Sequence, residues 1–254
     1  MILRRVIQHF RKQEWTAIWI DLVIVVVGVF IGIQVANWNE TRAERQREHL
    51  LLRELRAELA NSIRLTEGRR KAYAQVGRSG ARSIAFLDKG QDCSDACWPV
   101  IIDFFHASQW QAVDIALPTY EEMRRNGWPR KREIVDAVEA YKLQSQVIAK
   151  PLDQPPEYRA MVRGLIPLAI HRPYWTTCFE LTDRGDAYRE DCPAGVPAQV
   201  SSAGVDAIVN DPVIHRSLTQ WAGYVSSIPE TLDSQNQIAS RALVLIDAEL
   251  AAQP

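Results

Sequence analysis

The chain has 254 residues, 47% of them hydrophobic and 24% charged, and its formal net charge at pH 7 is −1. Because Lys and Arg are spread along the chain and balanced by acids, the sequence offers no electrostatic basis for binding nucleic acid, and we expect no nucleic-acid partner.

The first 14 residues form either a short basic cytoplasmic tail or an interfacial helix. The apolar residues Leu3, Val6, Ile7 and Phe10 fall at helical spacing among basic ones. A basic amphipathic helix of this kind lies on anionic lipid, so membrane lipid is an expected partner. A basic tail that stays on the cytoplasmic side accounts for the same residues.

Residues 15–38 are predicted to form a transmembrane helix. From Leu22 to Ile33 the sequence contains only Val, Ile, Leu, Phe and Gly. A helix needs about 20 such residues to cross the ~30 Å hydrocarbon layer. Tryptophans at both ends match the aromatic belt of membrane proteins. A buried core helix and a signal peptide are the alternatives. Since residues 33–38 contain no small-x-small cleavage site, we interpret the segment as an uncleaved anchor.

The orientation of this anchor does not follow from a simple count, because basic residues flank it on both sides. A long domain can be translocated regardless of its charge, whereas a short tail with four basic residues tends to stay inside. We therefore predict a single-pass protein of the inner (cytoplasmic) membrane, with a cytoplasmic N-terminus and residues 39–254 outside, in the periplasm.

One face of the predicted transmembrane helix combines an acid with two glycines. At about 100° per residue, Asp21, Gly28, Gly32 and Asn39 share this face. Glycines four residues apart let helices approach closely in lipid, and an intramembrane acid is a functional candidate. Ordinary membrane glycines and an acid at headgroup depth are the alternative. We predict a helix–helix interface, for a homo-oligomer or another membrane protein, at Asp21, Val25, Gly28, Gly32, Val35 and Asn39.

Residues 39–254 are predicted to be one mainly α, bundle-like extracytoplasmic domain, since they are numerous enough to bury a core. Leu52, Leu55, Leu59 and Ile63 predict that the membrane helix continues as a long amphipathic helix, which stops at Lys89-Gly90. The segment "CWPVIIDFFHASQW" predicts a short apolar helix. Residues 151–204 contain seven prolines and are expected to form an irregular, disulfide-linked insertion with short helices.

Four further helix boundaries can be predicted from local signals. Thr119 and Glu122 fit a capping box, and Gly127 fits the end of the same helix. The next helix presents Ile134, Val138 and Tyr141 on one face. Later helices are expected to begin at Pro212, with Asp211 as N-cap, and at Pro229.

The four cysteines all lie in the part predicted to be outside, where an even number suits an oxidising compartment. Three pairings are possible, and we favour the local one, Cys93 with Cys97 and Cys178 with Cys192. A zinc site is the alternative, but the 13 residues between Cys178 and Cys192 are unlike its ligand spacing.

No residue set predicts catalysis, a cofactor or a metal. His106, His171 and His215 lack the spacing of a metal-binding helix, and no Gly-x-Ser-x-Gly nucleophile elbow occurs. The acidic stretch "TDRGDAYRED" does not have a glycine and a terminal Glu at the positions that an EF-hand calcium loop requires, and a solvated turn is the alternative.

The segment "RRVIQHFRKQEWTAIWIDLVIVVVGVFIGIQVANWNE", followed by "LRELRAELANSI" and "TYEEMRRNG", resembles a widespread family of uncharacterised bacterial single-pass membrane proteins. The resemblance implies an N-terminal anchor and a helical fold, and it supplies no catalytic residues.

Together these features predict a membrane-anchored helical extracytoplasmic protein that acts as a binding or interaction module for a membrane or envelope partner. A subunit of an energised membrane complex that uses Asp21 is one alternative, and an exported hydrolase is another.

Overall fold

A computed structural model describes residues 15–252 apart from residues 91, 95 and 114. The predicted tail or interfacial helix of residues 1–14 lies outside this described part. The chain is mostly helical, as the sequence predicts, and it divides into two compact units, Met1–Leu51 and Leu52–Pro254.

The first described helix, α2, runs from Trp15 to Lys89 and is followed by Gly90, whose φ of +57° ends it. The predicted stop at Lys89-Gly90 is therefore confirmed. In the second unit, Leu52, Leu55 and Leu59 on this helix are fully buried, because the helical period places them on one side.

Among the described residues, eight α-helices follow α2 in the second unit. They are α3 (Cys97–Ala107), α4 (Pro118–Arg125), α5 (Arg132–Ala149), α6 (Glu157–Leu165), α7 (Leu168–Pro173), α8 (Ala198–Val209), α9 (Ile214–Val225) and α10 (Ile228–Ala252). A 3₁₀ turn, Lys150–Leu152, extends α5, and a π-helical turn, Tyr174–Cys178, follows α7.

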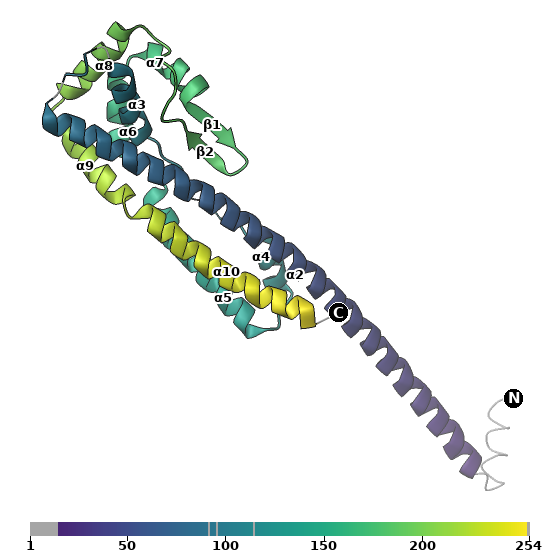
Figure 1. The fold of residues 1–254 in the computed structure, drawn as a ribbon. Coiled ribbons are helices and arrows are strands. Elements are labelled where there is room, and N and C mark those ends of the chain that lie inside the picture. The colour runs from purple at the N-terminus through teal and green to yellow at the C-terminus, as the bar shows by residue number, and fades with distance from the viewer. Residues whose placement is uncertain (1–14, 91, 95, 114, 253–254) are drawn as a thin grey trace. The chain divides into compact units, whose positions relative to one another are not determined.

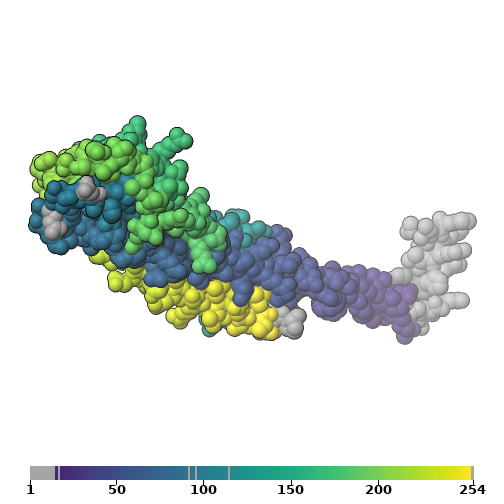
Figure 2. Space-filling view, turned by 45° about the horizontal axis from the view of Figure 1, so that its top comes forward, coloured from purple at the N-terminus to yellow at the C-terminus, as the bar shows by residue number. Residues whose placement is uncertain are grey.

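The long helix α10 packs against α5 and lies along α2 (Figure 1). Polar contacts join the three helices: Arg56 of α2 pairs with Asp247 of α10, and Ser62 and Tyr141 of α5 share a hydrogen bond of 2.6 Å. Figure 2 shows α10, in yellow, following one side of α2, while the green segment of the chain covers the opposite side.

A second group of helices surrounds α3, the most apolar of them. Eight of its eleven residues are buried, against residues of α6, α8 and α9 and the end of α2. Three tryptophans join distant segments here, because Trp98, Trp110 and Trp221 each donate to a backbone carbonyl, of Cys192, Leu152 and Ala107 respectively.

The Pro-rich region also contains a β-hairpin that the sequence did not lead us to expect. Strands β1 (Phe179–Thr182) and β2 (Gly185–Tyr188) pair antiparallel, with Phe179 opposite Tyr188. Gly185 takes a φ of +105°, a conformation that L side chains rarely adopt, and so permits the tight turn. The short helices α6 and α7 match the expectation for the rest of this region.

The hairpin turn lies directly against α2 at Gly68. A Cβ atom added to Gly68 would lie 1.9 Å from the Arg184 carbonyl oxygen, so the absence of a side chain is what allows this contact. Gly68 is therefore a docking position for the hairpin rather than a weak point in the helix.

Two helix starts differ from the prediction. The capping box is wrong: Thr119 lies inside α4 and donates its hydroxyl to Glu58 of α2, because a tertiary carboxylate is a stronger acceptor than a local backbone group. Helix α9 begins at Ile214, two residues after Pro212, and Asp211 Oδ1 accepts from the backbone N–H groups of Val213 and Ile214. The expected end of α4 at Gly127 (φ +78°) and the expected start of α10 near Pro229 agree with the structure.

Candidate functional site

The N-terminal part of α2 is one candidate functional surface. Within the described residues this is the helix that is long and apolar enough to cross a membrane. Its most apolar stretch of 18 residues has a mean hydropathy of 2.5, and none of that stretch is buried. From Leu22 to Val35 each large apolar side chain is 47–63% exposed. Such a surface needs an apolar environment around its whole circumference, whereas a core helix is covered by the protein itself.

The residues predicted as a helix–helix interface all lie on this exposed part of α2. Among the residues that the structure describes, no heavy atom of another segment lies within 4 Å of a Cβ built at Gly28 or Gly32. Asp21 and Asn39 are also exposed, at the two ends of the predicted face. Nothing within the described residues fills the groove at the glycines, so the geometry leaves the predicted interface open to a partner.

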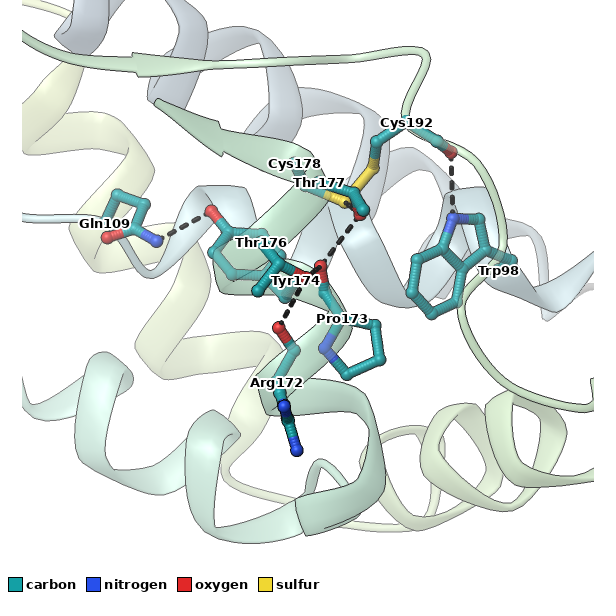
Figure 3. Close-up of a disulfide and its surroundings, with 9 residues drawn as sticks. All are labelled: Trp98, Gln109, Arg172, Pro173, Tyr174, Thr176, Thr177, Cys178 and Cys192. Atoms are coloured by element: carbon teal, nitrogen blue, oxygen red, sulfur yellow. Dashed lines mark hydrogen bonds between the residues drawn. A yellow bond between two sulfur atoms is a disulfide. The ribbon is translucent and has the colours of Figure 1, made fainter. Parts of the chain in front are cut away.

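The cysteines pair locally. Cys93 lies at disulfide distance from Cys97, with Cα atoms 4.9 Å apart, and Cys178 from Cys192, with Cα atoms 5.1 Å apart. Figure 3 shows the second pair at the base of the hairpin, where Cys192 O accepts from Trp98 Nε1 and Thr177 Oγ1 donates to Pro173 O. This is the pairing that we favoured from the sequence. The Cys178–Cys192 pair joins the two ends of the hairpin, and the Trp98 hydrogen bond links it to α3.

The three candidate histidines lie in different environments. His106 is 1% exposed and faces the rings of Tyr174 and Tyr188. Burial lowers its pKa to about 4, although a hydrogen bond to the backbone of Cys178 favours the charged form. His171 packs edge-on against Phe105, and His215 lies 3.0 Å from an oxygen of Asp88 on the surface. They do not converge on a common site.

The acidic stretch of the hairpin does not form a metal site either. Asp183 pairs with Arg64 of α2, and Asp186 accepts from the Tyr188 hydroxyl at 3.5 Å. In the part of the chain that the structure describes, no group of three His, Cys, Asp or Glu side chains is placed to hold a metal ion.

Two arginines of α6 form a cationic cluster that sequence reasoning missed. Arg159 Nη1 donates to Ser108 O at 2.9 Å, and Arg163 Nε donates to Ser108 Oγ at 2.9 Å. Arg163 also lies over the rings of Phe105 and Trp175, 4.7 and 5.4 Å from their centroids. The sequence signal, two arginines four residues apart, is weak because the residues that enclose them come from other segments.

A cavity of about 360 Å³ lies between α6 and α9. Its aromatic lining comes from Tyr158, Trp221 and Tyr224, and Gln154 and Gln220 add amide groups. The polar atoms of Tyr158 and Trp221 are already bound to carbonyls of Phe104 and Ala107, so their rings offer apolar surface. The volume is that of a small-ligand pocket.

No protein-family model, curated protein or solved structure matches the chain. The structure by itself defines a class: a mostly helical protein with an N-terminal helix apolar enough to cross a membrane and two cysteine pairs at disulfide distance.

Proposed function

We propose that this protein is anchored by residues 15–38 in the inner membrane and presents its helical domain in the periplasm as a binding module for a membrane or envelope partner. The observation that carries the proposal is the exposed apolar surface of α2 from Leu22 to Val35. Leaving one large aliphatic side chain in water rather than burying it costs about 1.5–3 kcal/mol, and lipid would cover this helix on every side.

The cysteines and the cavity support the other parts of the proposal. Both cysteine pairs suit an oxidising compartment, as expected for an exported domain. The aromatic cavity between α6 and α9 gives the domain a place to bind a small ligand or an exposed side chain of a partner. The open face around Gly28 and Gly32 gives the anchor a surface for a second helix.

Membrane extraction tests the anchor against a cleaved signal sequence, which has the same length and composition. We expect the full-length chain to stay in the membrane pellet after an alkaline wash, with an intact N-terminus by mass spectrometry. In spheroplasts, added protease should digest the helical domain, while a cytoplasmic marker protein remains intact. A processed chain in the soluble periplasmic fraction would contradict the anchor.

Cross-linking within the membrane tests the predicted interface. With a cysteine at Val35, we expect the Gly28→Ile/Gly32→Ile variant to lose cross-linked dimer or partner adduct, because the added side chains hold the helix backbones apart. The matched control Val26→Ile/Phe30→Ile changes two positions of equal spacing on the opposite face and should cross-link like the parent. Equal cross-linking in all three proteins would show that the glycines form no interface.

A further inference from the structure

We propose that Arg159 and Arg163 of α6 bind an oxyanion group, a phosphate or a carboxylate, of a ligand. The inference concerns only the second unit, and it does not depend on the membrane anchor or on the compartment of the domain.

The fold brings the two guanidinium groups together. They are one helical turn apart on α6, and both reach Ser108 at the end of α3, with donor–acceptor distances of 2.9 Å. Arg159 Nη1 also lies 3.4 Å from Oε1 of Gln109. The amide nitrogen of Gln109 in turn donates to Tyr174 OH. The two side chains are thereby fixed by neutral groups, at a separation at which like charges repel each other.

Neither of these two charges is paired with a carboxylate at ion-pair distance among the described residues. Among the described residues, neither arginine has an acidic oxygen within ion-pair distance, whereas Arg56, Arg64, Arg78 and Arg82 all have one. The Nη2 atom of Arg163 is buried and has no hydrogen-bond partner. Buried polar groups are nearly always bonded, so an orphaned guanidinium nitrogen indicates that a partner belongs there.

The electrostatic environment supports the same conclusion. Burial, followed by the neighbouring charge of Arg159, lowers the pKa of Arg163 to about 10. The pKa of Arg159 is also lowered by burial, and the Asp186 carboxylate acts on it only at a distance. A bound anion would reverse both effects, since it supplies the opposite charge and acceptors for the free N–H groups.

The surroundings favour an oxyanion over a halide ion. Guanidinium groups present planar pairs of N–H donors that match the oxygen spacing of phosphate and carboxylate. The Arg163 group lies over both the Phe105 and the Trp175 ring, and these contacts orient it before any ligand arrives. The ring of Trp175 is 38% exposed beside it and can contact an apolar part of the ligand.

The test measures the thermal unfolding midpoint of the full chain in mild detergent, in sodium phosphate, acetate or chloride at equal ionic strength. We expect phosphate or acetate at about 20 mM to raise the midpoint by about 2–4 °C over chloride. The anion with the larger shift identifies the group that is preferred. Equal midpoints in all three salts would overturn the proposal.

Substitutions separate a binding role from a structural one. Arg163→Met removes the uncompensated charge, so we expect it to abolish the anion-dependent shift while the midpoint in chloride stays equal or rises. Arg163→Lys keeps the charge without the planar fork and should need roughly tenfold more anion for the same shift. The exposed control Arg216→Met should keep the full shift. A phosphate or acetate shift that persists in Arg163→Met would also overturn the proposal.

Discussion

Acidification from about pH 7 to about pH 4 is expected to destabilise the folded protein by about 3 kcal/mol through His106 alone. This side chain is buried between two tyrosine rings, and its pKa is lowered to about 4. Its Nε2 atom has no hydrogen-bond partner, so protonation would place a charged N–H where no acceptor is available.

The direction follows from proton linkage. In the unfolded chain the His106 pKa returns to about 6.5, so between about pH 6.5 and pH 4 the unfolded state binds the proton and the folded state does not. The contribution of His106 to the free energy of unfolding is therefore complete above about pH 6.5 and decreases as the pH falls through this window. Below about pH 4 it changes little further.

Urea unfolding at several pH values measures this effect. His106→Gln is expected to flatten the pH dependence over the window, whereas His215→Gln, a surface substitution that keeps His106, should retain the loss of stability on acidification. Burial raises the pKa of Asp186, which gives an opposite dependence in the acid range, but that contribution is common to all three proteins. A pH dependence that is the same in His106→Gln and in the parent would contradict the assignment.

Removing the Cys178–Cys192 pair is expected to lower the free energy of unfolding by about 3 kcal/mol, since the bond closes a loop of about 15 residues in the unfolded chain. The pair also joins the end of the π-helical turn to the segment that accepts the hydrogen bond from Trp98. Urea unfolding of Cys178→Ala/Cys192→Ala under oxidising conditions measures the loss.

The matched comparison is Cys93→Ala/Cys97→Ala, which opens a loop with a sequence separation of only 4. We expect its loss to be about 1 kcal/mol smaller, because closing a shorter loop removes less conformational entropy from the unfolded chain. A larger loss for this pair than for Cys178–Cys192 would show that loop length does not control the contribution of either bond.

Features with a local signal could be predicted from the sequence. The apolar run from Leu22, the leucine period from Leu52 and the glycine at 127 each act within one helix, so the helical content and several helix ends followed directly. The predicted interface at Asp21, Gly28 and Gly32 depends on a partner helix and stays a prediction.

Features that depend on distant partners could not be predicted. Thr119 donates to Glu58 of α2 instead of capping its own helix. The hairpin turn packs against Gly68, which lies more than 100 residues earlier in the sequence. The arginine cluster likewise exists only because the end of α3 meets α6. In each case a tertiary contact overrides or completes what the local sequence specifies.

The position of α10 along α2 has a consequence for the time course of biogenesis. Arg56 and Asp247 pair across 191 residues of sequence, and α10 contributes the fully buried Leu232, Ala239, Ala242 and Ile246. Leu52, Leu55 and Leu59 leave the ribosome long before α10, which lies along this part of α2, is synthesised. During that interval the emerging chain carries an uncovered leucine stripe, which makes it a substrate for chaperones and vulnerable to aggregation until synthesis has passed residue 246.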